Sequence, residues 1–406
     1  MERCISALGL FVMIGLAWLM SAHRRRVNWQ LVAMGLLLQF GFAWLTLRTE
    51  TGRLTFDALG QLFSHVLDFV DAGASFVFGK EFRNYYFAFR VLPTIIFFSS
   101  LMSVLYYLGV MQRIVKLMSW VMQRTMHTSG AESLSAAANI FVGQTEAPLV
   151  IRPYVARMTN SELMTIMVGG FATIAGGVMA AYVGMGIDAG HLMTASIISA
   201  PAGLLIAKVL QPEVDQPDTL GRVASDLPQT SSNVIEAAAD GASEGLKLAL
   251  NVAAMLIAFL GLIALLDWCL GSIGSFYFAQ KWSLSKLLGY SFSPLAWLMG
   301  VPRQDCLAVG ELLGIRMVAN EFIAYEKLAE WIKHPPASGA LTERSRVLLT
   351  YALCGFANFG SIGIQIGGIG SLAPERRSDL ARLGLRAMLG GTLACFMTAC
   401  VAGVLL

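Results

Sequence analysis

The sequence predicts an all-α polytopic membrane protein with about eight transmembrane helices, two re-entrant helical hairpins in inverted repeats and an interfacial amphipathic helix. Three observations support this fold class: the composition, the number of apolar runs, and two apolar segments that each contain a carboxylate. Of the 406 residues, 56% are hydrophobic and only 14% are charged. A soluble domain averages roughly 25% charged residues, so lipid is the expected solvent for most of this chain.

Eight apolar runs approach the length of about 20 residues that a helix needs to cross the hydrocarbon core. They are Cys4–Ala22, Trp29–Leu47, Val91–Val110, Leu163–Gly186, Leu192–Leu210, Leu246–Leu265, Val347–Ile369 and Leu383–Leu406. Between the second and third runs, Asp57–Gly79 places apolar residues at helical spacing among histidine and aspartate. That pattern predicts an amphipathic helix lying in the membrane interface.

Two further segments are apolar but have a polar centre. Ser133–Ala156 and Pro302–Trp331 each consist of two short helical stretches, which meet near Glu146 and Glu321 respectively. Interrupted helices are tolerated at membrane depth only when they are buried in protein or line a cavity. Both segments are therefore predicted to be re-entrant hairpins.

Basic residues predict the orientation, because cytoplasmic loops carry an excess of lysine and arginine. Three clusters fall on one side if both termini are periplasmic: Arg24–Arg26; Arg113, Lys116 and Arg124; and Arg376, Arg377, Arg382 and Arg386. Four residues then face outward against this bias: Arg48, Arg53, Lys80 and Arg83. The expected location is the cell inner membrane. The net charge of +3 is too small to indicate a nucleic-acid-binding surface.

An internal repeat divides the chain. Thr145-Glu146 corresponds to Asn320-Glu321, and Gly170–Gly176 (GFATIAG) aligns with Gly355–Ser361 (GFANFGS). The first hairpin would enter from inside and the second from outside, so the repeats are predicted to be inverted, as in many secondary transporters. The predicted domains are 1–125 (first spans, interfacial helix and scaffold helix), 126–210 (first repeat), 211–244 (polar linker), 245–300 (second scaffold helix) and 301–406 (second repeat).

The two carboxylates at the hairpin centres are candidate functional residues. A charged side chain at the bilayer centre costs about 2.5–3.5 kcal/mol on insertion scales, and such residues commonly mark ligand or ion pathways. For Glu146 and Glu321 the alternative is a structural hydrogen bond between the two halves of a hairpin. Glu311, nearer the mouth of the second hairpin, fits that structural alternative better.

Neutral polar residues accompany the carboxylates: Gln144 and Thr145 in the first repeat, and Asn358 and Ser361 in the second. They suit a neutral polyhydroxylated or heteroaromatic ligand better than an anion, which would need arginine or lysine. Phe356 is a candidate to stack on a flat ring. The alternatives are helix–helix hydrogen bonding for Asn358 and Ser361, and a core or lipid-facing position for Phe356.

Oxygen ligands for a hard cation are also present. A broken helix frees backbone carbonyls, and Asn139, with an amide oxygen, and Thr173, with a hydroxyl, are expected to lie beside such carbonyls. The alternative for Thr173 is a hydrogen bond to its own helix.

Four segments carry a specific resemblance: GQTEAPLVIRPY (Gly143–Tyr154), GGFATIAG (Gly169–Gly176), ANEFIAY (Ala319–Tyr325) and CGFANFGSIGIQIGG (Cys354–Gly368). They resemble the concentrative nucleoside transporter family in its shorter bacterial form, and the likeness covers essentially the whole chain. The resemblance implies that the nucleobase is recognised by Gln144, Thr145 and Glu146, with Val178 beside it. It implies a ribose site at Glu321, Asn358 and Ser361, with Phe356 at the same pocket. The implied sodium ligands are Asn139, Val142, Thr173 and Ile174.

Three positions depart from the family pattern. Thr173 stands where some members have serine and keeps the hydroxyl group. Gly360 replaces the first serine of a common pair and removes one hydrogen-bonding group near the ribose. Gly177 stands where serine is frequent, so Gly177 and Gly360 both bear on base and sugar selectivity.

The hypothesis from the sequence is a cation-coupled symporter, with Na⁺ as the coupling ion, that imports nucleosides such as uridine or adenosine. The family implies a homotrimer and an alternating-access, elevator-like motion. A proton-coupled carrier of the same fold is the nearest alternative. A passive channel and an intramembrane enzyme using Glu146 and Glu321 are the others, although the sequence places no nucleophile, metal ligand or phosphate-binding loop beside that pair.

Overall fold

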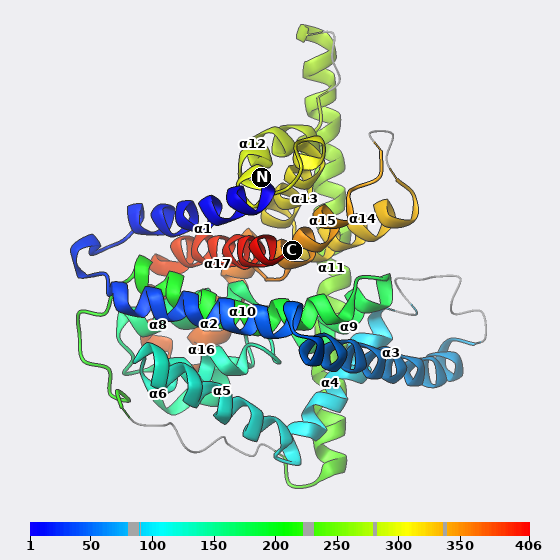
Figure 1. The fold of residues 1–406 in the computed structure, drawn as a ribbon. Coiled ribbons are helices and arrows are strands. Elements are labelled where there is room, and N and C mark those ends of the chain that lie inside the picture. The colour runs from blue at the N-terminus through cyan, green and yellow to red at the C-terminus, as the bar shows by residue number, and fades with distance from the viewer. Residues whose placement is uncertain (80–88, 90, 222–230, 279–281, 336–338) are drawn as a thin grey trace.

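The computed structural model describes residues 1–406 except 80–88, 90, 222–230, 279–281 and 336–338. Every regular element in these ranges is helical, which confirms the predicted all-α class (Figure 1). The α-helices are α1 (Glu2–Leu19), α2 (Trp29–Arg48), α3 (Glu50–Phe78), α4 (Leu92–Tyr107), α5 (Val110–Met126), α6 (Gly130–Ala138), α7 (Arg152–Val155), α8 (Asn160–Ala172), α9 (Gly176–Met185), α10 (Ala189–Leu210), α11 (Val234–Phe278), α12 (Leu284–Leu298), α13 (Cys306–Val318), α14 (Glu321–Lys333), α15 (Glu343–Leu353), α16 (Phe359–Leu372) and α17 (Arg377–Leu405).

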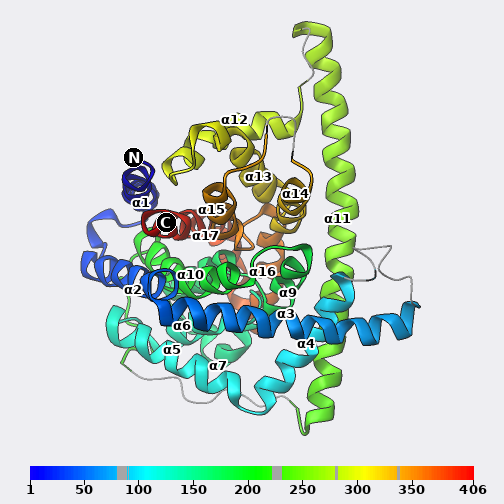
Figure 2. The same ribbon diagram turned by 45° about the vertical axis from the view of Figure 1, so that its right-hand side comes forward.

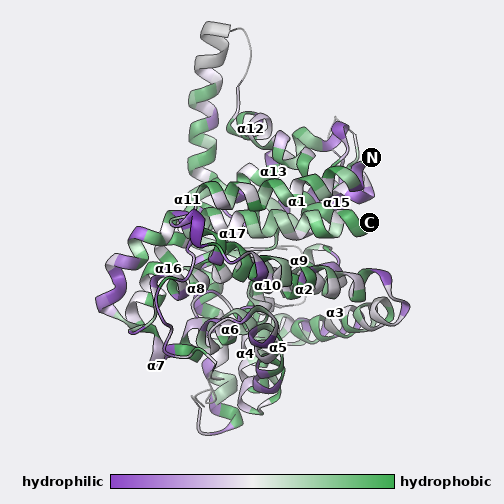
Figure 3. Ribbon diagram, turned by 60° about the vertical axis from the view of Figure 1, so that its left-hand side comes forward, coloured by the Kyte–Doolittle hydropathy of each residue, from purple (hydrophilic) through white to green (hydrophobic). Residues whose placement is uncertain are grey.

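The helices form a buried centre and an exposed periphery. α8, α10 and α17 are almost entirely buried, whereas α11 stands as a long rod along one edge of the molecule (Figure 2). Glycines let the central helices approach closely, as is common in membrane bundles. A Cβ atom at Gly391 of α17 would lie 2.3 Å from the Cβ atom of Phe171 in α8. Apolar residues run along the exposed part of α11, as expected for a surface in contact with lipid (Figure 3).

Within the described ranges, six helical segments are long and apolar enough to cross a membrane: Glu2–Leu19, Trp29–Arg48, Asn160–Met185, Ala189–Leu210, Val234–Ser272 and Pro374–Leu405. Each corresponds to a predicted span. A seventh, α4 with α5, is bent by 77°. The remaining predicted span, Val347–Ile369, is divided between α15 and α16.

Two of the predicted spans are interrupted by short non-helical segments. α8 ends at Ala172 and α9 begins at Gly176, while α15 ends at Leu353 and α16 begins at Phe359. The two GFA segments lie at these two breaks. Asn358 caps α16 by accepting a hydrogen bond from the backbone N–H of Ser361 (2.9 Å), and asparagine favours such a cap over a helix interior. Each break contains one polar residue, Thr173 or Asn358, among apolar ones and glycine, so a hydropathy pattern does not separate it from helix.

Both predicted hairpins are present as pairs of short helical segments. The first consists of α6, then a 3₁₀ turn over Ala147–Ile151, then α7. In the second, α13 and α14 are separated only by Ala319 and Asn320, and Asn320 caps α14 by accepting from the N–H of Ile323 (2.9 Å). Glu311 forms an ion pair with Lys327 across this hairpin, in line with a structural role.

A buried ionic cluster fixes the base of the first hairpin. Lys208, in the last turn of α10, lies 2.8 Å from Glu132 of α6 and 3.1 Å from Glu213, and donates to the Ser161 hydroxyl of α8 (2.9 Å). Glu132 also completes the cap of α6 by accepting from the backbone N–H of Ser129 (2.8 Å). One lysine therefore ties together α6, α8 and the segment that follows α10.

The elements outside the apolar runs are longer than predicted. α11 has 45 residues and begins inside the range predicted as linker, because Asn233 accepts from the N–H of Glu236 (2.9 Å) and so starts the helix early. α3 likewise begins at Glu50, where Thr49 accepts from the N–H of Gly52 (2.9 Å). The range 245–300 contains a second helix, α12. The middle of the predicted linker, and Lys80 and Arg83 of the predicted topology, lie outside the described residues.

Candidate functional site

The two helix breaks meet at the centre of the molecule. The backbone N–H of Phe356 donates to the carbonyl oxygen of Thr173 (3.2 Å). A Cβ atom at Gly355 would lie 2.6 Å from the carbonyl oxygen of Phe171, so the second break requires glycine at this point. This hydrogen bond gives one backbone group in each break a partner. Irregular backbone at membrane depth is tolerated only when its polar groups find such partners within the protein.

Glu321 is buried at the start of α14, beside the second break. The Tyr182 hydroxyl of α9 donates to one carboxylate oxygen (3.1 Å), and the Asn358 amide donates to the other (3.1 Å). A carboxylate has about four lone-pair sites. These two side chains therefore occupy about half of that capacity.

Gln144, from the first hairpin, reaches the same region. Its amide nitrogen donates to the Ser361 hydroxyl (3.3 Å), and its amide oxygen accepts from the nitrogen of Gln365 in α16 (3.0 Å). The Gln365 nitrogen also donates to the carbonyl oxygen of Met167 in α8 (3.1 Å). All three polar side chains are buried.

Asn358 joins these two groups into one hydrogen-bond chain. Its amide oxygen accepts from the Ser361 N–H, and its nitrogen donates to Glu321. The chain runs from Met167 to Glu321 and links both hairpins with α8 and α16. Four residues that the sequence pointed to, from segments up to 217 positions apart, are brought together here: Gln144, Glu321, Asn358 and Ser361.

Three other predicted ligand residues lie beside the chain without joining it. A Cβ atom at Gly368 would lie 2.8 Å from the Thr145 methyl group, so that methyl packs against α16. Val178 is buried in α9, and Phe356 is half-buried in the second break.

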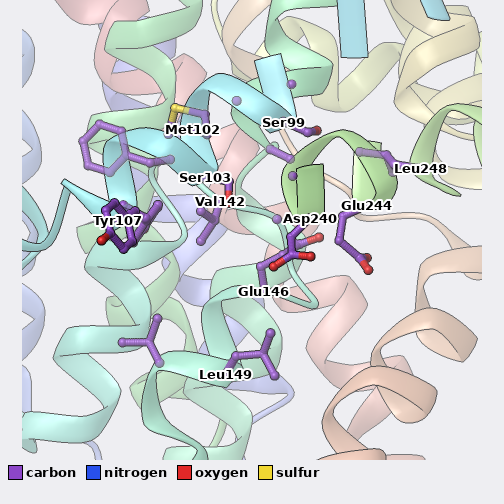
Figure 4. A pocket seen from close by; sticks show the side chains of 18 of the residues that line it. Ser99, Met102, Ser103, Tyr107, Val142, Glu146, Leu149, Asp240, Glu244 and Leu248 are labelled. Atoms are coloured by element: carbon purple, nitrogen blue, oxygen red, sulfur yellow. The ribbon is translucent and has the colours of Figure 1, made fainter. Parts of the chain in front are cut away.

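Glu146 is separate from this chain and lines a cavity of about 300 Å³, at the lower end of the range for small-molecule sites. The cavity lies between the first hairpin and two peripheral helices. Its polar lining includes Glu146, Ser99 and Ser103 of α4, and Asp240 and Glu244 of α11. Figure 4 shows Glu146 and Asp240 directed into the same space, with Glu244 beside them. No local pattern indicates that α4 and α11 contribute to this cavity, because their contribution depends on tertiary packing.

The predicted cation ligands gather where the first hairpin meets α8. Asn139 is buried, and neither its amide oxygen nor its nitrogen has a hydrogen-bond partner among the described residues. A Cβ atom at Gly169 would lie 3.3 Å from the Asn139 nitrogen, and the Thr173 hydroxyl donates to the Gly169 carbonyl oxygen (2.9 Å). Both side chains are therefore adjacent to Gly169. Ile174 is buried in the break, while Val142 is half-buried and lines the cavity.

An unpartnered buried amide is costly, so the surroundings of Asn139 favour a bound ligand. An amide oxygen, a hydroxyl that still has free lone pairs, and carbonyls near a helix break are the donors that a hard monovalent cation prefers. Among the described residues, no group of three or more histidine, cysteine, aspartate or glutamate side chains forms a metal site. The donor set thus fits an alkali cation better than a transition metal.

Three residues of the site were missed by the sequence analysis. Tyr182 gave no signal, since a tyrosine in an apolar helix is commonplace. Gln365 is an amide inside the apolar run of α16, which was a usable signal. Arg316 is fully buried on α13 and donates to the carbonyl oxygens of Ala352 (2.9 Å) and Gly355 (3.3 Å). It therefore holds the end of α15 at the second break.

Three family models match successive parts of the chain. They are described as the N-terminus of a Na⁺-dependent nucleoside transporter (residues 8–81), nucleoside recognition (88–189) and the C-terminus of a Na⁺-dependent nucleoside transporter (191–403). Together they cover nearly the whole sequence.

Similar proteins come from animals and bacteria. Solute carrier family 28 member 3 of Eptatretus stoutii is 47% identical over all of this chain, and sodium/nucleoside cotransporter 1 of Rattus norvegicus is 45% identical. The chain spans only 61% and 64% of the lengths of these two relatives. An uncharacterized transporter of Haemophilus influenzae is 46% identical over 98% of this chain and 97% of its own length.

Solved structures of CNTnw share the fold. The inward-facing, substrate-bound state has a TM-score of 0.94 at 42% identity and covers 100% of this chain and 98% of that one. A double variant of CNTnw in an outward-facing state has the same TM-score, identity and coverage.

Proposed function

The chain belongs to the concentrative nucleoside transporter family, and on that premise we propose that it is a sodium-coupled symporter that carries nucleosides across the cell inner membrane. The observation that supports this most directly is the hydrogen-bond chain from Gln144 to Glu321. It places neutral amide and hydroxyl groups from one hairpin next to a carboxylate from the other. A ligand bound here would have a heteroaromatic part with polar edges and a part with hydroxyl groups.

In this proposal the two ends of the chain bind the two parts of a nucleoside. Glu321, Asn358 and Ser361 bind the ribose hydroxyls, because a carboxylate held by neutral donors retains lone pairs that can accept from hydroxyl groups. Gln144 contacts the base, aided by Thr145, Glu146 and Val178, and Phe356 flanks the pocket. The cavity at Glu146 would be the route by which the nucleoside reaches or leaves the first hairpin.

Sodium would bind at Asn139 and Thr173, with the carbonyl groups of Val142 and Ile174. The unpartnered amide of Asn139 supports this position. One sodium ion moving down the membrane potential supplies about 2.3 kcal/mol per 100 mV. At about 1.4 kcal/mol per tenfold ratio, that supports roughly 40-fold accumulation of the nucleoside. Proton coupling is the alternative, with Glu146 or Glu321 as the proton carrier.

Uridine uptake into proteoliposomes is expected to require an inward sodium gradient. The purified chain should accumulate labelled uridine when sodium is outside, and should not do so with potassium at the same ionic strength. Uptake that ignores sodium and follows an imposed pH gradient would establish the proton alternative. Equilibration without accumulation under either gradient would indicate a passive channel.

Thr173→Val is expected to weaken the dependence of uridine binding on sodium. Binding of the ion and the nucleoside at adjacent sites is reciprocal, so losing one oxygen ligand should shift the sodium response to higher concentration while weak uridine binding remains. Thr165→Val is a matched control, because Thr165 is buried in α8, the helix that ends just before Thr173, and its hydroxyl also donates to the carbonyl four residues earlier (3.0 Å). Equal effects of both changes on the sodium response, measured by calorimetry in detergent, would refute the assignment of Thr173.

The proposal extends to how the protein works in the membrane. Both termini are placed in the periplasm, three copies form the transporter, and the hairpins move with the central helices against the peripheral ones. The intramembrane enzyme is set aside, because the family and the matched structures are transporters. Substrate is bound and released unchanged.

A further inference from the structure

We infer that Gln365 fixes the orientation of the Gln144 amide, so that Gln144 turns its oxygen toward Gln365, offers the remaining N–H of its nitrogen to the base and selects nucleosides with an exocyclic oxo group over those with an amino group. The inference rests on the proposed function, since it takes Gln144 as a contact of the base. It names Gln365 as a positioning residue and 4-oxopyrimidine and 6-oxopurine nucleosides as the preferred class.

The orientation of Gln365 is set by a group that can only accept. Its amide nitrogen lies 3.1 Å from the carbonyl oxygen of Met167. A turned amide would place oxygen against oxygen at that distance, so the nitrogen must face Met167. The same nitrogen lies 3.0 Å from the side chain of Gln144.

The orientation of Gln144 follows from that of Gln365. Because the Gln365 nitrogen is a donor, Gln144 must present its oxygen to it, and the Gln144 nitrogen then faces Ser361 (3.3 Å). The opposite end of the chain agrees with this direction. The Ser361 N–H can only donate, so Asn358 gives it an oxygen and turns its own nitrogen toward the acceptor-only Glu321.

The two glutamines have little room to rearrange. A Cβ atom at Gly170 would lie 2.7 Å from the Gln365 nitrogen and 2.9 Å from the Gln144 Cβ atom. Gln365 is fully buried, and its own amide oxygen has no hydrogen-bond partner among the described residues. The Gln365 side chain is thus held over the backbone of α8, and it holds the Gln144 amide in turn.

An N–H donor at Gln144 distinguishes bases by the exocyclic group at position 4 of a pyrimidine or position 6 of a purine. An oxo group accepts a hydrogen bond from the Gln144 N–H. An amino group places its own N–H donors against the Gln144 N–H, so no hydrogen bond forms. A hydrogen bond of ordinary strength corresponds to about tenfold in affinity. The wild-type protein should therefore bind uridine about tenfold more tightly than cytidine, and inosine about tenfold more tightly than adenosine.

Gln365→Leu is the test, with the full chain in detergent and uridine, cytidine, inosine and adenosine as competitors of bound labelled uridine. Without Gln365, the Gln144 amide is free to turn, so each oxo-to-amino affinity ratio should fall to near one. Gln39→Leu is the matched control. Gln39 is as buried as Gln365, and its amide nitrogen donates to the backbone carbonyl oxygen of Ile198 (3.2 Å). Like Gln365, it has an amide oxygen without a hydrogen-bond partner among the described residues. It should lower stability in a similar way and leave both ratios unchanged.

A second variant keeps the inference open to refutation if Gln365→Leu folds poorly. Gln144→Glu replaces the donor with an acceptor and should favour cytidine over uridine. The inference is overturned if wild-type protein binds cytidine and adenosine as well as or better than the oxo nucleosides, or if Gln365→Leu keeps the wild-type ratios. Either result leaves nucleoside transport intact. Absence of any nucleoside binding would instead overturn the proposed function, and the inference with it.

Discussion

Lys208→Met is expected to lower the free energy of unfolding by about 3–5 kcal/mol, the usual cost of removing one partner from a buried ion pair. Lys208 is the cation of a buried cluster, 2.8 Å from Glu132 and 3.1 Å from Glu213. Methionine has a similar length but no charge, so both carboxylates would lose their counterion. The measurement is chemical unfolding in mixed micelles.

Lys247→Met is the matched control for that substitution. Lys247 forms an ion pair with Glu244 at 2.7 Å, but the two side chains are 68% and 67% exposed. Exposed pairs contribute about 0–1 kcal/mol, so this variant should unfold almost as the wild type does. Equal losses in the two variants would show that the cluster at the base of the first hairpin does not stabilise the fold.

Glu321→Gln is expected to weaken uridine binding by about 10- to 150-fold, which corresponds to the 1.5–3 kcal/mol of hydrogen bonds to a charged group. Glutamine keeps the shape but turns one acceptor oxygen into a donor, which opposes the amide of Asn358 or the hydroxyl of Tyr182. The measurement is a binding titration with uridine, 2′-deoxyuridine and 3′-deoxyuridine.

The deoxynucleosides separate ligand binding from fold. An analogue that lacks the contacted hydroxyl forms no hydrogen bond with Glu321 at that position. Its affinity should therefore fall less than that of uridine when Glu321 is changed to glutamine. Glu326→Gln, at an exposed position of the same helix, should change none of the three affinities. A uniform loss for all three nucleosides in Glu321→Gln, with a lowered unfolding temperature, would assign Glu321 to structure alone.

The sequence predicted the membrane fold because lipid solvation leaves a signal in every apolar run. It did not locate the interruptions at Thr173–Ala175 and Cys354–Asn358, because each lies inside a run that hydropathy treats as one continuous helix. What ends the helices is tertiary: the two breaks bond to each other through Phe356 and Thr173. The repeated GFA segment lies at both interruptions, but the repeat alone does not show that the helices end there.

For the candidate site, the informative feature of the sequence was polar residues inside apolar segments, because burying such groups costs free energy unless they bind a partner. It pointed to Glu321, Gln144, Asn358 and Ser361, which the structure brings together. It also grouped Glu146 with them, although Glu146 lines a separate cavity. Tyr182 was missed because its role depends on a hydrogen bond across 139 residues, which no local pattern reveals. Gln365 was missed although its amide stands inside an apolar run, because its partner Gln144 lies 221 residues away.

The length of α11 indicates how deep in the membrane the cavity at Glu146 lies. At 1.5 Å per residue, its 45 residues form a rod about 68 Å long, more than twice the roughly 30 Å of a hydrocarbon core. The exposed apolar side chains from Leu246 to Trp268 extend over about 34 Å and account for the immersed part. Asp240 and Glu244 precede that stretch, and we expect them to lie near one edge of the hydrocarbon core. On the route proposed above, a nucleoside that passes Glu146 through this cavity would therefore be close to the water boundary.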